Sequence, residues 1–102
     1  MTLEQWAGRL DALARAEQLA IPAHGTNERG YPDWSAGGRG AWVRVAEDDA
    51  TLRMFFVPRD PADTALADEE RSHEKTYVRS DVGAREAARD LARFLRGAQA
   101  AQ

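Results

Sequence analysis

Aromatic and basic side chains alternate on one side of a predicted β-hairpin that covers residues 39–60. Trp42 and Arg44 fall on this side of the first strand, and Arg53 and Phe55 fall on the same side of the second, because alternate residues of a strand point to opposite faces. Large aromatic rings and forked guanidinium groups are enriched at the centres of protein interfaces. The pattern predicts a binding surface for a carboxylate-rich partner, with phosphate as the other chemistry it could recognise.

The opposite side of the same hairpin is aliphatic and defines its register. Residues 47–50 form the turn, so Ala46 lies opposite Thr51 whether the loop has two or four residues. The expected cross-strand pairs are Val45 with Leu52, Val43 with Met54, Ala41 with Phe56, Trp42 with Phe55, and Arg44 with Arg53. Like charges that face each other destabilise a hairpin, and no acidic residue in the two strands offsets the arginine pair.

A third strand is predicted over residues 74–80, with Thr76 and Val78 on one side and Lys75, Tyr77 and Arg79 on the other. We assign the second side to the same surface as the aromatic side of the hairpin. The predicted partner-binding residues are then Trp42, Arg44, Arg53, Phe55, Lys75, Tyr77 and Arg79.

The sequence contains no recognisable catalytic, metal or cofactor motif. It has no cysteine, which excludes disulfides, thiolate metal sites and cysteine nucleophiles. His24 and His73 are its two histidines, and neither shows a ligand spacing with nearby carboxylates, so both are predicted to be single surface residues. The glycine-rich stretch 37–40 lacks the Gly-Lys-Ser/Thr ending of a P-loop and leads into a strand. We predict that the protein is not an enzyme and uses neither metal nor cofactor.

Two amphipathic helices flank the predicted strands. The first follows Thr2, which can form a capping box with Gln5, and it is predicted to end at Pro22. Its apolar residues recur at helical spacing, at Leu3, Trp6, Leu10, Leu13 and Ala14. Asp11 and Arg15 are assigned to the solvent side as an ordinary ion pair. The second helix begins at Ser80 or Asp81 and ends at Gly97.

Two further segments show no clear periodicity. Residues 21–40 are rich in glycine and proline and are predicted to form a long loop, anchored by Tyr31 and by Trp34 packed at the edge of the core. Residues 58–74 are acidic and could include a short helix. Either segment could cover the aromatic side of the sheet, which is the main alternative to an exposed binding surface.

These elements predict a single α+β domain over residues 1–102. The expected architecture is two-layered, with a three-stranded antiparallel sheet and both helices on one face, in the order α-β-β-β-α. Double-stranded RNA-binding domains share this order, but their second helix begins with a lysine cluster that this chain lacks. The order of elements therefore does not indicate that function.

Charge and composition restrict the partners further. The net charge is −3 and the sequence pI is about 5.3, which argues against binding that depends on phosphate neutralisation. The chain has neither a membrane-length apolar run nor the features of a signal peptide, so we expect a cytoplasmic protein, or one secreted by an unusual route, with no membrane partner. Arginine and alanine are abundant and Lys75 is the sole lysine, a bias that indicates a GC-rich genome. We expect a bacterial or phage source.

The sequence therefore predicts a small non-enzymatic protein-binding module that is inhibitor-like, immunity-like or chaperone-like. Its expected partner is another protein with an acidic surface, and a homodimer is a variant of the same idea. The alternative is a nucleic-acid-binding domain whose aromatic residues stack on bases while its cations contact phosphates.

Overall fold

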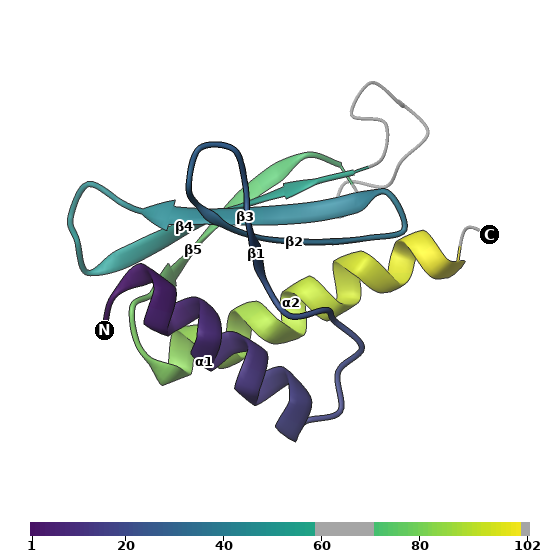
Figure 1. The fold of residues 1–102 in the computed structure, drawn as a ribbon, viewed down its shortest axis with the longest axis horizontal. Helices are drawn as coiled ribbons and strands as arrows, with labels where there is room; N and C mark the ends of the chain where they lie inside the picture. The colour runs from purple at the N-terminus through teal and green to yellow at the C-terminus, as the bar shows by residue number, and fades with distance from the viewer. Residues whose placement is uncertain (59–70, 101–102) are drawn as a thin grey trace.

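The computed structural model describes residues 1–58 and 71–100, with side chains through residue 96. Helix α1 (Leu3–Ala16) is followed by strands β1 (Gly25–Thr26), β2 (Pro32–Ala36), β3 (Arg39–Val45), β4 (Thr51–Val57) and β5 (His73–Val78), and then by helix α2 (Asp81–Ala100). The five strands form one antiparallel sheet in the order β1-β2-β3-β4-β5 (Figure 1).

The prediction of a three-stranded sheet is wrong, because the segment 21–40 contains β1 and β2 instead of a long loop. Glycine, proline and aspartate disfavour strands, so composition concealed these two elements. Pro32 occupies the first position of β2, where a missing backbone donor is tolerated. Gly37 and Gly38 have φ angles of 61° and 83°, and they form the tight turn that returns β2 onto β3. The α+β order is therefore α-β-β-β-β-β-α.

The register of the β3–β4 hairpin is confirmed for all five predicted pairs. Trp42 lies opposite Phe55, Arg44 opposite Arg53, and Val43 opposite Met54. Ala46 donates its backbone N–H to the carbonyl of Thr51 at 3.0 Å and closes the turn as expected. This part of the fold is determined locally, because a slip of one residue would move every aliphatic side chain out of the core.

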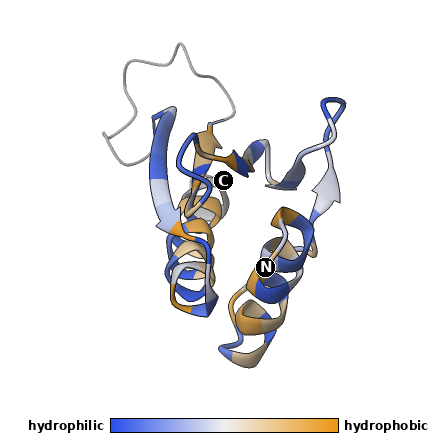
Figure 2. Ribbon diagram, turned by 90° about the vertical axis from the view of Figure 1, so that its left-hand side faces the viewer, coloured by the Kyte–Doolittle hydropathy of each residue, from blue (hydrophilic) through white to orange (hydrophobic). Residues whose placement is uncertain are grey.

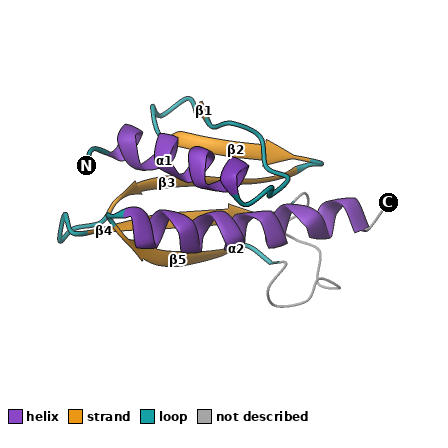
Figure 3. Ribbon diagram, turned by 90° about the horizontal axis from the view of Figure 1, so that it is seen from below, coloured by secondary structure: helices purple, strands orange, loops and turns teal. Residues whose placement is uncertain are grey.

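Both helices lie side by side against the same face of the sheet (Figures 1 and 2). Viewed from the helical side, α1 crosses the half of the sheet that holds β2 and β3, and α2 crosses the half that holds β4 and β5 (Figure 3). The largest fully buried side chains fill the space between these layers, and they are Trp6, Leu10, Trp34, Val43, Leu52, Met54, Phe56, Tyr77, Leu91 and Leu95. The apolar stripes of the two helices therefore form the core with the aliphatic side of the hairpin.

Helix α1 starts as predicted and ends earlier than predicted. The Thr2 side chain accepts from the backbone of Gln5, and the Gln5 side chain accepts from the backbone of Thr2, which completes the capping box. The helix ends at Ala16, six residues before Pro22, and Gln18 has a φ of 57°. This left-handed residue turns the chain toward β1 before the proline is reached.

The acidic segment predicted over residues 58–74 falls largely outside the described residues, since 59–70 are not described. Its possible helix and its possible contact with the sheet therefore stay predictions. The C-terminal end of the segment, from His73, belongs to β5.

Candidate functional site

The face of the sheet that points away from the helices carries a row of stacked aromatic rings. Trp42 of β3 stacks on Phe55 of β4, with ring centres 4.2 Å apart and planes inclined by 15°. Tyr31, which precedes β2, stacks on the other side of Trp42 at 5.5 Å and 19°. All three side chains are partly exposed. We call these residues the aromatic row and the surface around them the open face.

Two arginines lie beside the aromatic row on the same face, two residue pairs further along the β3–β4 hairpin. Arg44 and Arg53 face each other across the strands, as the sequence predicted. Arg53 pairs with Glu47 in the turn at 3.2 Å, so its charge is partly offset. The Arg44 guanidinium lies 5.6 Å from the centre of the Phe55 ring, and among the described residues no carboxylate pairs with it. The Arg44 guanidinium also donates to the Val45 carbonyl at 3.4 Å. Arg44 is thus a half-buried cation that lies against an aromatic ring and can bind an anionic partner.

Carboxylates flank the aromatic row at both ends. Asp33 of β2 lies opposite Trp42, and Glu74 of β5 lies opposite Phe55. On the neighbouring strand β5, the residue opposite Arg53 is the uncharged Thr76. The open face therefore combines an aromatic stripe with acidic ends and a short basic stripe, and it is less basic than the sequence predicted.

Three predicted site residues do not belong to the open face. Tyr77 lies opposite Leu52 and is buried in the core, and Lys75 lies opposite Met54 on the helical side. Arg79 follows β5 and donates to the backbone carbonyls of Met1 and Asp49. The predicted position of these three residues is wrong. The two sides of β5 are similarly polar, so the sequence pattern did not distinguish the buried side.

Helix α2 explains why the polar side of β5 that carries Lys75 and Tyr77 can face the helices. Asp90 accepts a hydrogen bond from the Tyr77 hydroxyl at 2.7 Å and pairs with Lys75 Nζ at 2.7 Å. Burial, followed by the hydrogen bond to Asp90, raises the pKa of Tyr77 above its usual range. The hydrogen bond to Asp90 also raises the pKa of Lys75. A tyrosine can be buried when its hydroxyl finds such a partner, and Val78 is left exposed in its place.

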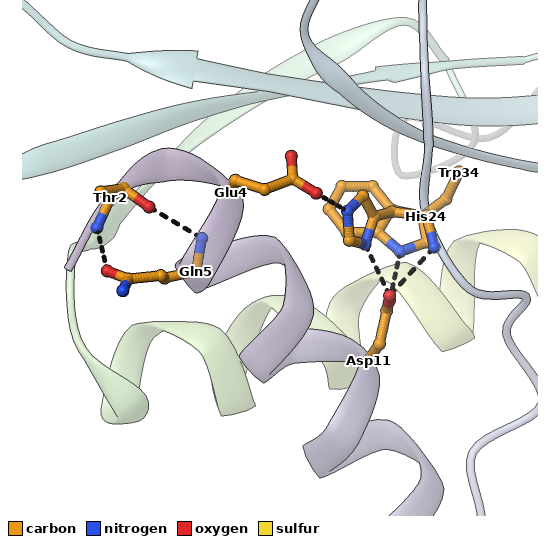
Figure 4. Close-up of polar contacts among 6 residues, drawn as sticks. All are labelled: Thr2, Glu4, Gln5, Asp11, His24 and Trp34. Atoms are coloured by element: carbon orange, nitrogen blue, oxygen red, sulfur yellow. Dashed lines mark hydrogen bonds and ion pairs between the residues drawn. The ribbon is translucent and has the colours of Figure 1, made fainter.

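A second polar cluster lies between α1 and the sheet, and the sequence reasoning missed it (Figure 4). Asp11 is buried, and its prediction as a solvent-side residue paired with Arg15 is wrong. Its Oδ1 accepts from Trp34 Nε1 at 2.8 Å, and its Oδ2 lies 2.6 Å from His24 Nδ1. Glu4 Oε1 lies 2.5 Å from His24 Nε2. Glu4 and Asp11 are seven residues apart, two turns on one helical side, which is the one signal that the sequence offered.

The described residues contain no group of histidine or carboxylate side chains placed to hold a metal ion. None of the helices in the described ranges is long and apolar enough to cross a membrane. Comparison with known proteins finds no matching family model, no similar curated protein and no similar solved structure. The function must therefore be inferred from the surfaces themselves.

Proposed function

We propose that the protein is a small non-enzymatic module that docks another protein through the open face. The proposal is supported above all by Arg44, which lies half-buried beside the aromatic row with no carboxylate partner among the described residues. Aromatic rings with a neighbouring arginine are the combination that dominates binding energy at protein interfaces. The partner would place carboxylates against Arg44 and Arg53 and apolar side chains against the aromatic row.

A protein partner fits this surface better than a nucleic acid does. Stacking proteins present ring faces to successive bases. Here the faces of Trp42 lie against Tyr31 and Phe55, so the rings cover one another. Asp33 and Glu74 flank the row and would repel phosphates, and the overall charge of −3 would do the same.

The proposal that the module is not an enzyme rests partly on His24. A general base needs a ring nitrogen within reach of a substrate proton. Both ring nitrogens of His24 are committed to carboxylates, Nδ1 to Asp11 and Nε2 to Glu4. The finer roles of inhibitor, immunity-like protein or chaperone, a cytoplasmic location and a bacterial or phage source belong to the same proposal.

The proposal is tested by reversing one charge on the open face. Arg44→Glu places a carboxylate opposite Arg53, and an opposite-charge pair is more favourable than the present arginine pair. We therefore expect the free energy of unfolding to stay within about 1 kcal/mol of wild type. Binding to a partner captured from the source cells should weaken by about thirtyfold or more, which corresponds to the loss of about 2 kcal/mol at an arginine hot spot.

The matched control is Arg93→Glu, the same reversal on the exposed side of α2, where Arg93 is 75% exposed. It should bind the partner like wild type. Equal binding by wild type and Arg44→Glu would contradict the proposal. Salt-sensitive binding to a mixed oligonucleotide pool that is lost in Arg44→Glu would favour the nucleic-acid alternative instead. A wild-type dimer that dissociates in Arg44→Glu would identify the partner as a second copy of the chain.

A further inference from the structure

His24 connects two turns of α1 to the chain that enters the sheet. Its side chain reaches Glu4 through Nε2 and Asp11 through Nδ1, and its backbone N–H donates to Asp11 Oδ2 at 3.0 Å (Figure 4). The Trp34 ring lies 5.9 Å from the imidazole and closes the cluster from the side of β2. The imidazole is thus enclosed by α1 and β2, although 15% of its side-chain surface remains accessible to solvent.

The two carboxylate contacts impose a protonation state on the ring. An ionised carboxylate only accepts hydrogen bonds, so each ring nitrogen must carry a proton to make its contact. Only the imidazolium form has two N–H groups, and a neutral imidazole can satisfy one carboxylate while its other lone pair faces an anion. The cluster is therefore complete only while His24 is charged.

The two carboxylates would respond differently when the proton leaves. Asp11 is buried and also holds Trp34 Nε1 and the His24 backbone, so it keeps the remaining N–H on Nδ1. Glu4 is 69% exposed and can rotate into water at little cost. Loss of the proton therefore breaks the Glu4 contact and leaves the Asp11 contact in place.

The chain that follows His24 leads directly to the aromatic row. Gly25 and Thr26 form β1, and Asn27 then donates its backbone N–H to the Tyr31 carbonyl at 2.8 Å. The Asn27 side chain accepts from the Tyr31 backbone at 3.0 Å. A short edge strand of two residues provides little anchorage of its own. His24 therefore holds this segment at its β1 end, while β2, which pairs with β3, holds it at the Tyr31 end.

We propose that His24 is a proton-operated latch that fastens the segment from β1 to Tyr31 onto α1 when it is charged and loosens this segment when it is neutral. The latch goes beyond the proposed docking role and stands whether or not the open face binds a protein. Its effect is a change in the order of one edge of the open face.

The charges around His24 raise its pKa, so the latch should open at a higher pH than an ordinary histidine would lose its proton. Burial lowers the pKa of His24, but the hydrogen bonds and charges of Glu4 and Asp11 outweigh burial, and the net pKa is raised above 6.5. Among the packed elements, α1 contributes these two carboxylates and β2 contributes the uncharged Trp34 ring. Among the described residues, Glu4 and Asp11 are the charged groups that act on His24.

The latch is tested by an NMR titration of the two histidines in the full chain, in wild type and in Glu4→Gln. Nitrogen chemical shifts should report two protonated ring nitrogens on His24 at mildly acid pH and a midpoint above 6.5. Glu4→Gln removes the charge at an exposed site and should lower that midpoint. Glu86→Gln, the same substitution at an exposed residue of α2, should leave His24 as in wild type.

Amide hydrogen exchange of Asn27 and Tyr31 provides the structural readout. After correction for the intrinsic pH dependence of exchange, protection of these amides should fall by a factor of about two to five as His24 loses its proton, as expected for one partly exposed ion pair. In Glu4→Gln the fall should be reduced. A His24 ring with a single proton at mildly acid pH would overturn the proposal, and so would a midpoint at or below 6.5 or protection that does not change across the titration.

Discussion

The two tryptophans of β2 and β3 provide a direct test of which sheet face is covered. Trp34 is 2% exposed and donates its Nε1 to buried Asp11, whereas Trp42 is partly exposed and contacts two neighbouring rings. Removing a fully buried tryptophan side chain costs about 3–5 kcal/mol. Trp34→Ala would also leave an oxygen of Asp11 unsatisfied, at a further cost of about 1–3 kcal/mol. The sum is close to the whole stability of a domain of this size, so this variant is expected to be largely unfolded.

Trp42→Ala should behave differently, because it removes stacking on Tyr31 and Phe55 without opening a cavity in the core. Each aromatic contact contributes about 0.5–1.5 kcal/mol, so the expected cost is about 1–3 kcal/mol. Urea unfolding followed by far-ultraviolet circular dichroism measures both variants on one scale. Equal damage from the two substitutions would refute the assignment of Trp42 to an exposed face.

Substitution by phenylalanine makes the same comparison measurable if Trp34→Ala does not fold. Trp34→Phe keeps a ring but removes the donor to Asp11, and it should cost about 1–3 kcal/mol. Trp42→Phe keeps a ring in the aromatic row and should change the free energy of unfolding by less than about 0.5 kcal/mol. A larger loss of unfolding free energy for Trp42→Phe than for Trp34→Phe would contradict the assignment of Trp34 to the covered face and Trp42 to the open face.

Two further predictions concern the helices and pH. Gly83→Ala should destabilise the protein by about 1–3 kcal/mol or more, because the new Cβ would lie 2.0 Å from the Val78 carbonyl oxygen. Gly8→Ala should stabilise it by about 0.5–1 kcal/mol, because a Cβ there would have nothing within 4 Å. Urea midpoints that rank the two variants the other way would contradict this packing. Because the pKa of His24 is raised in the folded state, its charged form contributes stability that is fully present below pH 6.5 and is lost as the pH rises through the folded-state pKa. As the pH rises from 6.5 through that pKa, the urea midpoint of wild type should therefore fall relative to the urea midpoint of Glu4→Gln. Parallel pH profiles for the two proteins would show that the Glu4 contact contributes nothing.

Local sequence patterns predicted much of the fold correctly. The capping box at Thr2 and the register of the β3–β4 hairpin follow from residues close together in the chain, and the structure confirms both. The burial of Trp34 is confirmed as well. Of the predicted binding residues, the four on the hairpin do share one face, because their alternation is read within a single element.

Most of the predictions that failed required knowledge of distant partners. β2 is a poor strand by composition and forms because it pairs with β3. Tyr77 can face the core because Asp90 on α2 accepts a hydrogen bond from its hydroxyl. Asp11 can be buried because His24 and Trp34 donate hydrogen bonds to it. Each of these polar groups looks like a surface residue until a hydrogen-bond partner far along the chain removes the cost of burying it.

The sequence by itself determined that two helices flank the strands, but not where they end, since α1 stops at Ala16 before Pro22 and α2 runs to Ala100 past Gly97. It also determined the central hairpin and the row of aromatic and arginine side chains upon it, since periodicity within one element decides which residues share a side. Only the tertiary structure decided how many strands join that hairpin, which side of β5 is buried, and that His24 is held between two carboxylates. Those outcomes depend on contacts between residues far apart in the chain, where the free energy of satisfying a buried polar group outweighs local preference.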